Sequence, residues 1–173
     1  MRFAATAIVL AGLATPAPPA AADDTLLARF AGEWIGRGIF RQGPEGDPEN
    51  VYCKITNALA DGGDELTMRG RCALASNTAA ISFTITAEGG GRYSGGGGGL
   101  GIAARGQATV TGIARGSRID LSAELLDTVT EKSSTGTATI DVLADGSYRI
   151  RARATQKATG ISYTAAEVLF EPQ

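Results

Sequence analysis

The chain of 173 residues has two cysteines and no histidine, which limits the chemistry that it can perform. Without histidine there is no imidazole base, no Ser-His or Cys-His nucleophile pair, and no ligand of the type that most often binds transition metals. Cys53 and Cys72 form an even pair, which in an oxidising compartment predicts a disulfide. The expected role of these cysteines is therefore structural.

The acidic side chains do not form a paired-carboxylate site. In the hairpins predicted below, no Asp or Glu occupies an inward position, and Asp120 and Glu124 are expected to face solvent. Acid–base catalysis by carboxylates needs two such groups in environments that shift their pKa values apart. We therefore expect no enzyme activity, no catalytic residue, no metal site and no cofactor.

Glycines dominate the segment Gly89–Gly101. Gly96, Gly98 and Gly101 match the dinucleotide pattern G-x-G-x-x-G, and Asp120 follows about 20 residues later. A run of five glycines matches many patterns by chance, however, and no helix or βαβ unit follows it. We expect a flexible loop or a weak, bent edge strand, with a mobile lid as a further role.

The first 22 residues are typical of a secretory signal peptide. Arg2 gives a positive start, residues 3–13 are apolar, and residues 20–22 are small alanines that suit cleavage. The apolar run is too short to span a membrane, and no later stretch reaches the required length. A periplasmic or secreted protein without a transmembrane segment is expected.

Residues 23–173 have the size of one domain with a single core. The whole chain carries 16 basic and 18 acidic residues, interspersed along the sequence. Nucleic acid is not an expected partner, because phosphate binding requires a concentrated basic face. The partners that remain are a small apolar ligand or another envelope protein.

Almost every segment after residue 31 alternates apolar and polar residues between glycine-rich turns, which predicts half-buried strands joined by hairpins. Ile81, Phe83 and Ile85 give one such one-faced strand. The only helix expected is short, over residues 24–30, with Asp23 or Asp24 as its cap. The fold class is therefore all-β, with eight to ten strands.

Turn chemistry predicts the register of three hairpins. A two-residue Gly62-Gly63 loop places Cys53 opposite Cys72, with both cysteines on the apolar face and within disulfide range. A Gly116-Ser117 loop and a three-residue loop over 144–146 predict two further hairpins. Their expected partners are Val110 with Ala123, Gly112 with Leu121, Ala108 with Leu125, Val142 with Tyr148, and Ala138 with Ala152.

Strands with one apolar face and a single short helix to cover them must close on themselves or form a sandwich. An antiparallel up-and-down barrel is the first expectation, and a β-sandwich is the alternative. Small residues are concentrated on one side of the expected interior, where they leave room for a ligand. The residues expected to line it are Ala108, Val110, Gly112, Leu121, Ala123, Ala138 and Ala152.

Gly32-Glu33-Trp34 follows the short helix and begins the first strand. It resembles the Gly-x-Trp signature of the calycin superfamily, the lipocalins and fatty-acid-binding proteins. The resemblance implies that Gly32 and Trp34 belong to the barrel floor, with the helical turn closing it. It also implies that an Arg from a late strand packs on Trp34, for which Arg149, Arg151 and Arg153 are available.

Two further resemblances concern exported bacterial proteins. The residues that resemble a family of small exported proteins of undefined function are 31–38, Cys53, 71–73 and 91–95, although a Trp expected after Ser94-Gly95 is replaced by glycine. Gly32, Trp34 and the two cysteines also resemble periplasmic inhibitors of secreted metalloproteases. That resemblance implies that residues 23–27 would block the protease, although the cysteine spacing differs.

Two functions are therefore expected from the sequence. The first is an exported, non-enzymatic binding protein for a small, mostly apolar ligand. The alternative is an envelope protein–protein interaction module, such as a protease inhibitor, whose interior is fully packed.

Overall fold

The computed structural model describes residues 25–98, 106–127 and 133–173. Within these ranges the chain forms one short helix, α1 (Thr25–Ala28), and ten strands. The strands are β1 (Gly32–Phe40), β2 (Glu49–Leu59), β3 (Glu65–Ala73), β4 (Thr78–Gly89), β5 (Arg92–Gly98), β6 (Gly106–Arg115), β7 (Arg118–Asp127), β8 (Ser133–Val142), β9 (Tyr148–Gln156) and β10 (Ser162–Pro172).

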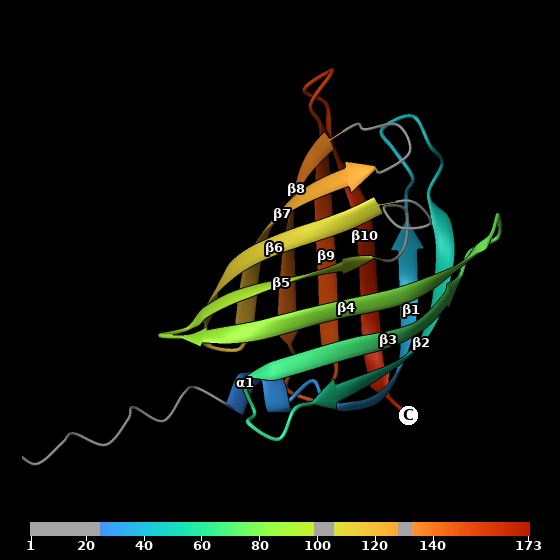
Figure 1. The fold of residues 1–173 in the computed structure, drawn as a ribbon. Helices are drawn as coiled ribbons and strands as arrows, with labels where there is room; N and C mark the ends of the chain where they lie inside the picture. Colours follow the sequence, from blue (N-terminus) through green and yellow to red (C-terminus); the bar gives the residue numbers. More distant parts are fainter. Residues whose placement is uncertain (1–24, 99–105, 128–132) are drawn as a thin grey trace, which may run out of the picture.

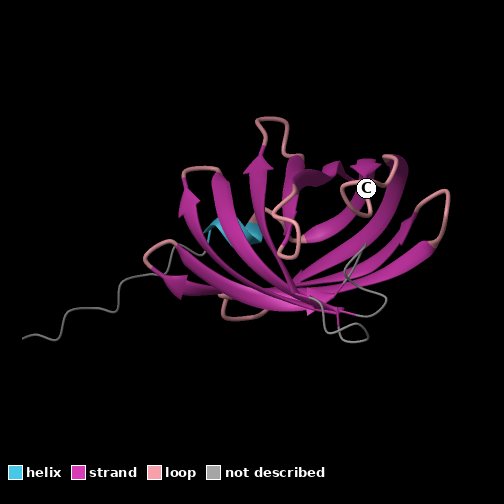
Figure 2. Ribbon diagram, turned by 90° about the horizontal axis from the view of Figure 1, so that it is seen from above, coloured by secondary structure: helices cyan, strands magenta, loops and turns pink. Residues whose placement is uncertain are grey.

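The ten strands form one closed antiparallel barrel in which each strand pairs with its sequence neighbours (Figure 1). β1 pairs with β10, so the barrel closes between Trp34 and Pro172 at one end of the seam and between Phe40 and Ala166 at the other. Seen from above, the strands curve around a common interior (Figure 2). The predicted all-β barrel is confirmed, and the sandwich alternative is excluded.

Local turn chemistry gave the correct register in all three hairpins. Cys53 lies opposite Cys72, Val110 opposite Ala123, and Ala138 opposite Ala152. The 144–146 loop has the expected form, with Gly146 at φ 85° and the Leu143 N–H donating to Ser147 O at 2.8 Å. Alternation of apolar residues therefore sets one inward face on these strands.

The Gly62-Gly63 turn is longer than predicted. The Ala60 N–H donates to Glu65 O at 2.8 Å, so the loop comprises residues 61–64 rather than two glycines alone. The Gly63 N–H also donates to Ala60 O at 2.9 Å, and Gly63 has φ 75°. Adding one residue on each side keeps the same register, which is why the pairing of the cysteines is unchanged.

The described part of the glycine-rich segment contains a turn at Gly90-Gly91, and the strand β5 that follows it is not an edge strand. β5 pairs with β4 on one side and β6 on the other, with Gly95 opposite both Ile85 and Val110. In a closed barrel no strand is an edge, and backbone hydrogen bonds hold β5 although it has few side chains to pack. Residues 99–101 of the predicted segment, and with them the lid hypothesis, lie outside the described residues.

The helix closes one end of the barrel, the lower end in Figure 1. It covers Thr25–Ala28, shorter than predicted, and a turn follows in which the Phe30 N–H donates to Leu27 O at 3.0 Å. Leu26, Leu27 and Phe30 are buried. The proposed caps Asp23 and Asp24 lie outside the described residues.

A buried aromatic cluster lies beneath this helix, and Tyr148 is at its centre. The Tyr148 ring stacks on Phe170, with centroids 4.8 Å apart, and makes edge contacts with Phe30 and Trp34 at 5.2 and 4.7 Å. Trp34 Nε1 and Asn57 Nδ2 each donate to Phe30 O at 2.8 Å. These bonds satisfy the carbonyl where the helical turn ends and fix it to the barrel wall.

The residue packed on Trp34 is therefore a tyrosine, and the expected arginine is not there. Tyr148 begins β9 with its side chain inward. Because side chains alternate along a strand, those of Arg149, Arg151 and Arg153 face outward. Arg149 pairs with Glu167 at 4.0 Å and Arg151 with Asp141 at 2.9 Å, while the Arg153 side chain is exposed. This part of the calycin resemblance is not met.

Candidate ligand cavity

The barrel interior contains a cavity of about 440 Å³. Its walls come from nine of the ten strands, β2 being the exception, and it extends toward the end of the barrel opposite α1. Larger apolar side chains line it on the β3–β4 side, where Met68, Ile81 and Phe83 lie. The predicted inward face of Ile81, Phe83 and Ile85 is observed.

Small residues line the opposite wall. Ala123 lies between Val110 and Gly136 on the neighbouring strands, and Ala138 lies between Leu121 and Ala152. Because alanine and glycine occupy several adjacent inward positions, the side chains from this wall do not reach across the interior. The cavity is the space that they leave.

Six of the seven residues that the sequence places in the cavity wall are there. They are Ala108, Val110, Leu121, Ala123, Ala138 and Ala152. Gly112 is the exception and does not line the cavity. An added Cβ at Gly112 would lie 2.5 Å from Leu121 Cδ2 and 2.7 Å from Asp120 O, so the Leu121 side chain and the β7 backbone cover this position.

The open end of the cavity is polar, which the sequence analysis did not predict. Arg41, Gln42, Ser134 and Tyr163 line it together with the apolar residues. Arg41 and Gln42 directly follow β1, and Tyr163 lies at the start of β10. Apolar alternation ends at these positions, so only their place at a strand end or just beyond one signals that they surround the opening.

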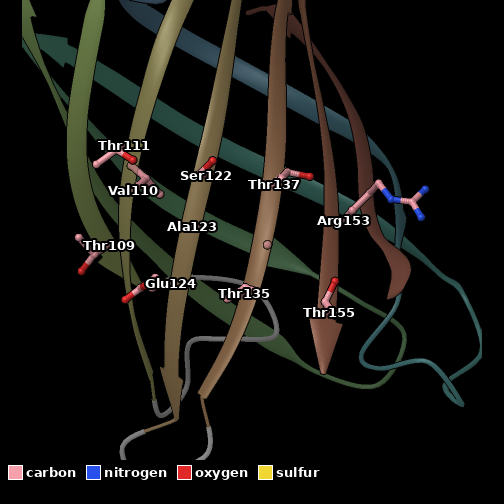
Figure 3. A pocket seen from close by; sticks show the side chains of 11 residues that line it. Thr109, Val110, Thr111, Ser122, Ala123, Glu124, Thr135, Thr137, Arg153 and Thr155 are labelled. Carbon is pink, nitrogen blue, oxygen red and sulfur yellow. The ribbon is translucent and has the colours of Figure 1, made fainter. Parts of the chain in front are cut away.

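A second hollow, of about 580 Å³, lies over β6–β9 on the outer face of the same wall (Figure 3). Its lining side chains are short and mostly hydroxylic, among them Thr109, Thr111, Ser122, Thr135 and Thr155. Side chains of this kind suit solvent, and the hollow has little apolar area to bury a ligand. The interior cavity is therefore the better candidate site.

Asp141 is the centre of a small charge cluster on the outer face. Asp141 accepts hydrogen bonds from Arg118 at 2.6 Å and from Arg151 at 2.9 Å. Partial burial raises the pKa of Asp141, but these two bonds outweigh it and the net pKa is lowered. The cluster lies outside the barrel and does not contribute to the cavity.

The disulfide joins Cys53 of β2 to Cys72 of β3 on the inward face. Both cysteines are fully buried. Among the described residues, no group of three or more His, Cys, Asp or Glu could hold a metal ion. No helix in the described ranges is long and apolar enough to cross a membrane.

The segment expected to block a protease is partly buried in the floor. Leu26 is 8% exposed and Leu27 is 1% exposed, whereas Asp23 and Asp24 lie outside the described residues. Deleting residues 23–27 would therefore remove core side chains as well as a terminal extension. We therefore do not expect such a deletion to leave the fold intact.

The fold is similar to that in the crystal structure of Rv2717c from M. tuberculosis, with a TM-score of 0.64. The two sequences are 14% identical, and the alignment covers 85% of this chain and 94% of that one. At this identity the likeness shows the barrel fold alone. No family model and no curated protein matches the chain in sequence.

Proposed function

We propose that this protein is an exported, non-enzymatic, calycin-like binding protein that holds a small, mostly apolar molecule inside its barrel. The observation that carries the proposal is the interior cavity of about 440 Å³ with its alanine-rich wall. Its volume lies within the range of roughly 300–1,000 Å³ that is usual for small-molecule sites. Such sites are mainly apolar with a few polar groups at one end, as this one is.

The two ends of the barrel support a single direction of entry. The end beneath α1 is filled by Phe30, Trp34 and Tyr148, all of them buried. The cavity extends toward the other end, where Arg41 and Tyr163 line it. A ligand would therefore enter between the loops at the open end and lie with its apolar part toward the floor.

Export is the second part of the proposal. Residues 1–22 have the composition of a signal peptide, and a buried disulfide suits an oxidising compartment. A periplasmic or secreted carrier would protect an apolar molecule from water in a compartment where it is otherwise sparingly soluble.

The test is binding of an apolar fluorescent probe, N-phenyl-1-naphthylamine, to the purified protein. We expect saturable binding that the Ala123→Phe variant abolishes, because the phenyl ring would occupy the cavity. Ser122→Phe is the matched control, since Ser122 is the preceding residue and is exposed on the outer face. Equal probe binding by all three proteins, or none by the unmodified protein, would refute the proposal.

A further inference from the structure

Four large apolar side chains of the described residues are exposed, and two of them lie beside each other on the outer face of the barrel. Ile39 of β1 is 52% exposed and Tyr52 of β2 is 40% exposed. Tyr52 pairs with Arg37, two residues before Ile39, so the two apolar side chains are diagonal neighbours. Exposed apolar side chains scattered singly need no partner, whereas adjoining ones indicate an interaction surface.

The apolar surface continues around Arg37. Ile35 lies two residues earlier on β1, and Leu169 of β10 pairs directly with Arg37 where the barrel closes. Both are half-buried. Four apolar side chains thus surround one arginine. We call this region, with the charged side chains that border it, the seam face; its strands β10, β1, β2 and β3 lie next to one another (Figure 1).

The two borders of the seam face carry opposite charges. On the β10 side, Glu171 is the cross-strand partner of Ile35, and Glu167 lies on the same strand face. On the other side, Lys54 of β2 is the partner of Ile35, and Arg71 of β3 is the partner of Lys54. The apolar centre therefore separates an acidic strand from a basic pair of strands.

The fold of a single chain leaves the basic border without counter-charges. Lys54 and Arg71 lie directly opposite each other, and like charges in this arrangement destabilise a sheet. Among the described residues, neither of them makes an ion pair. An acidic surface placed over them would offset their repulsion. The protein carries such a surface on β10, where the Glu171 side chain remains 56% exposed although it lies 3.0 Å from Arg37.

We propose that the seam face binds a second copy of this chain, giving a two-fold symmetric dimer. In such a dimer the same surface serves both subunits and must complement itself. A two-fold axis parallel to β1 keeps the position along the strands and exchanges the two sides, so β10 of one subunit faces β2 of the other. Glu171 then lies over Lys54 of the partner subunit, because both are cross-strand partners of Ile35.

The apolar centre meets its own counterpart in this arrangement. Ile35 and Ile39 lie on the strand that faces itself, and Tyr52 faces the strand that carries Leu169. The two Arg37 side chains also approach each other, but each is already paired with a carboxylate and lies 5.6 Å from the centre of the Tyr52 ring. Apolar burial supplies the free energy of association, and the charged borders fix the orientation.

The molar mass of the purified protein, measured by light scattering after size exclusion over a range of concentrations, tests the proposal. We expect twice the mass of one chain. Ile39→Asp should weaken dimerisation at least about tenfold, because it buries like charges at the interface. Ile113→Asp is the matched control and should leave the dimer unchanged, since Ile113 is 49% exposed but lies on β6. Circular dichroism reports whether each variant is folded.

Charge reversal tests the orientation of the two subunits. Lys54→Glu or Glu171→Lys alone sets like charges against each other twice in the symmetric dimer, and each should weaken dimerisation at least about tenfold. The double variant Lys54→Glu/Glu171→Lys restores opposite charges and should recover dimerisation. Recovery of this kind is not expected if the two residues act only within one chain.

A monomer at every concentration would overturn the inference and leave the proposed cavity function standing, because probe binding does not depend on the seam face. A dimer that Ile39→Asp leaves unchanged, or that Ile113→Asp weakens equally, would also overturn it. Failure of the double variant to recover dimerisation would overturn the contact between Glu171 and Lys54.

Discussion

The two ends of this barrel are built from the same alternating strands but are filled differently. At the closed end, α1 and the rings of Phe30, Trp34, Tyr148 and Phe170 pack together. Toward the open end, the inward positions of β6–β9 hold mainly alanine, and a cavity remains. Hydrogen bonding between neighbouring strands thus keeps the barrel wall closed whether or not the interior is filled. One end can therefore be tightly packed while the other holds a cavity for a ligand.

The largest effect should come from removing the centre of the closed end. Tyr148→Ala deletes a ring that is 1% exposed and contacts three other aromatic side chains. We expect the free energy of unfolding to fall by about 3–5 kcal/mol, as for other large aromatic truncations. Urea denaturation measures it, and a loss below about 1 kcal/mol would show that this end is not the packed one.

The disulfide lies in a fully buried part of the barrel wall, and its removal should have the next largest effect on the free energy of unfolding. Replacing both Cys53 and Cys72 by alanine releases a link between residues 19 apart in the sequence. A chain-entropy model gives a loss of about 3 kcal/mol. Denaturation of the double variant beside the oxidised protein checks this, and equal stability of the two would contradict it.

Alkaline pH should weaken the closed end selectively. Burial raises the pKa of Tyr148, with a hydrogen bond from Asn57 acting in the opposite direction. The unfolded tyrosine titrates near pH 10, so the stabilisation is complete below about pH 10 and is lost as the pH rises further. The loss can reach about 1.4 kcal/mol per pH unit for this group.

Tyr148→Phe should remove this contribution, because phenylalanine has no proton to lose. Stability measured from pH 9 to 11.5 should therefore decline less steeply in Tyr148→Phe than in the unmodified protein. Tyr52→Phe serves as the control, since Tyr52 is exposed. Parallel pH profiles for all three proteins would show that Tyr148 is not shielded from solvent.

The smallest change in stability is expected at the open end. Ala123→Phe places a ring in the cavity, where few atoms oppose it, so the free energy of unfolding should change by less than about 1 kcal/mol. Ile55→Phe, in the buried wall of β2 opposite Trp34 at the closed end, should instead cost about 1–3 kcal/mol or more. Similar losses in both variants would mean that the two ends are equally packed.

The sequence predicted those parts of the fold that depend on neighbouring residues. Alternation and turn chemistry act within one hairpin, so the pairings of Cys53 with Cys72 and Val110 with Ala123 could be derived from local spacing. The strand β5 could not be derived in this way. Glycine has no side chain to show alternation, and β5 is held by its two neighbours in the closed sheet rather than by its own residues.

The cavity wall was mostly predicted, and its polar opening was not. Ala123 and Ala138 follow from register alone, because inward positions repeat every second residue. Gly112 was misplaced because register does not show that the side chain of its partner Leu121 folds over it. Arg41 and the central role of Tyr148 depend on which strand ends and side chains meet across the barrel, and no local pattern carries that information.

Pairing of β1 with β10 also has a consequence for the time course of folding. The strands that close the barrel contribute Arg37 and Glu171, which are 134 residues apart in the chain and 3.0 Å apart in space. Every other pairing joins consecutive strands, so the meander can grow one hairpin at a time, whereas this last step must overcome the entropy of closing a loop nearly as long as the domain. The closure step should be the slow one, and until it occurs β1 and β10 each present an unpaired edge that can join a second molecule. Trp34 lies on β1 at this seam and is the single tryptophan of the chain, so the change in its fluorescence during refolding measures the rate of that step.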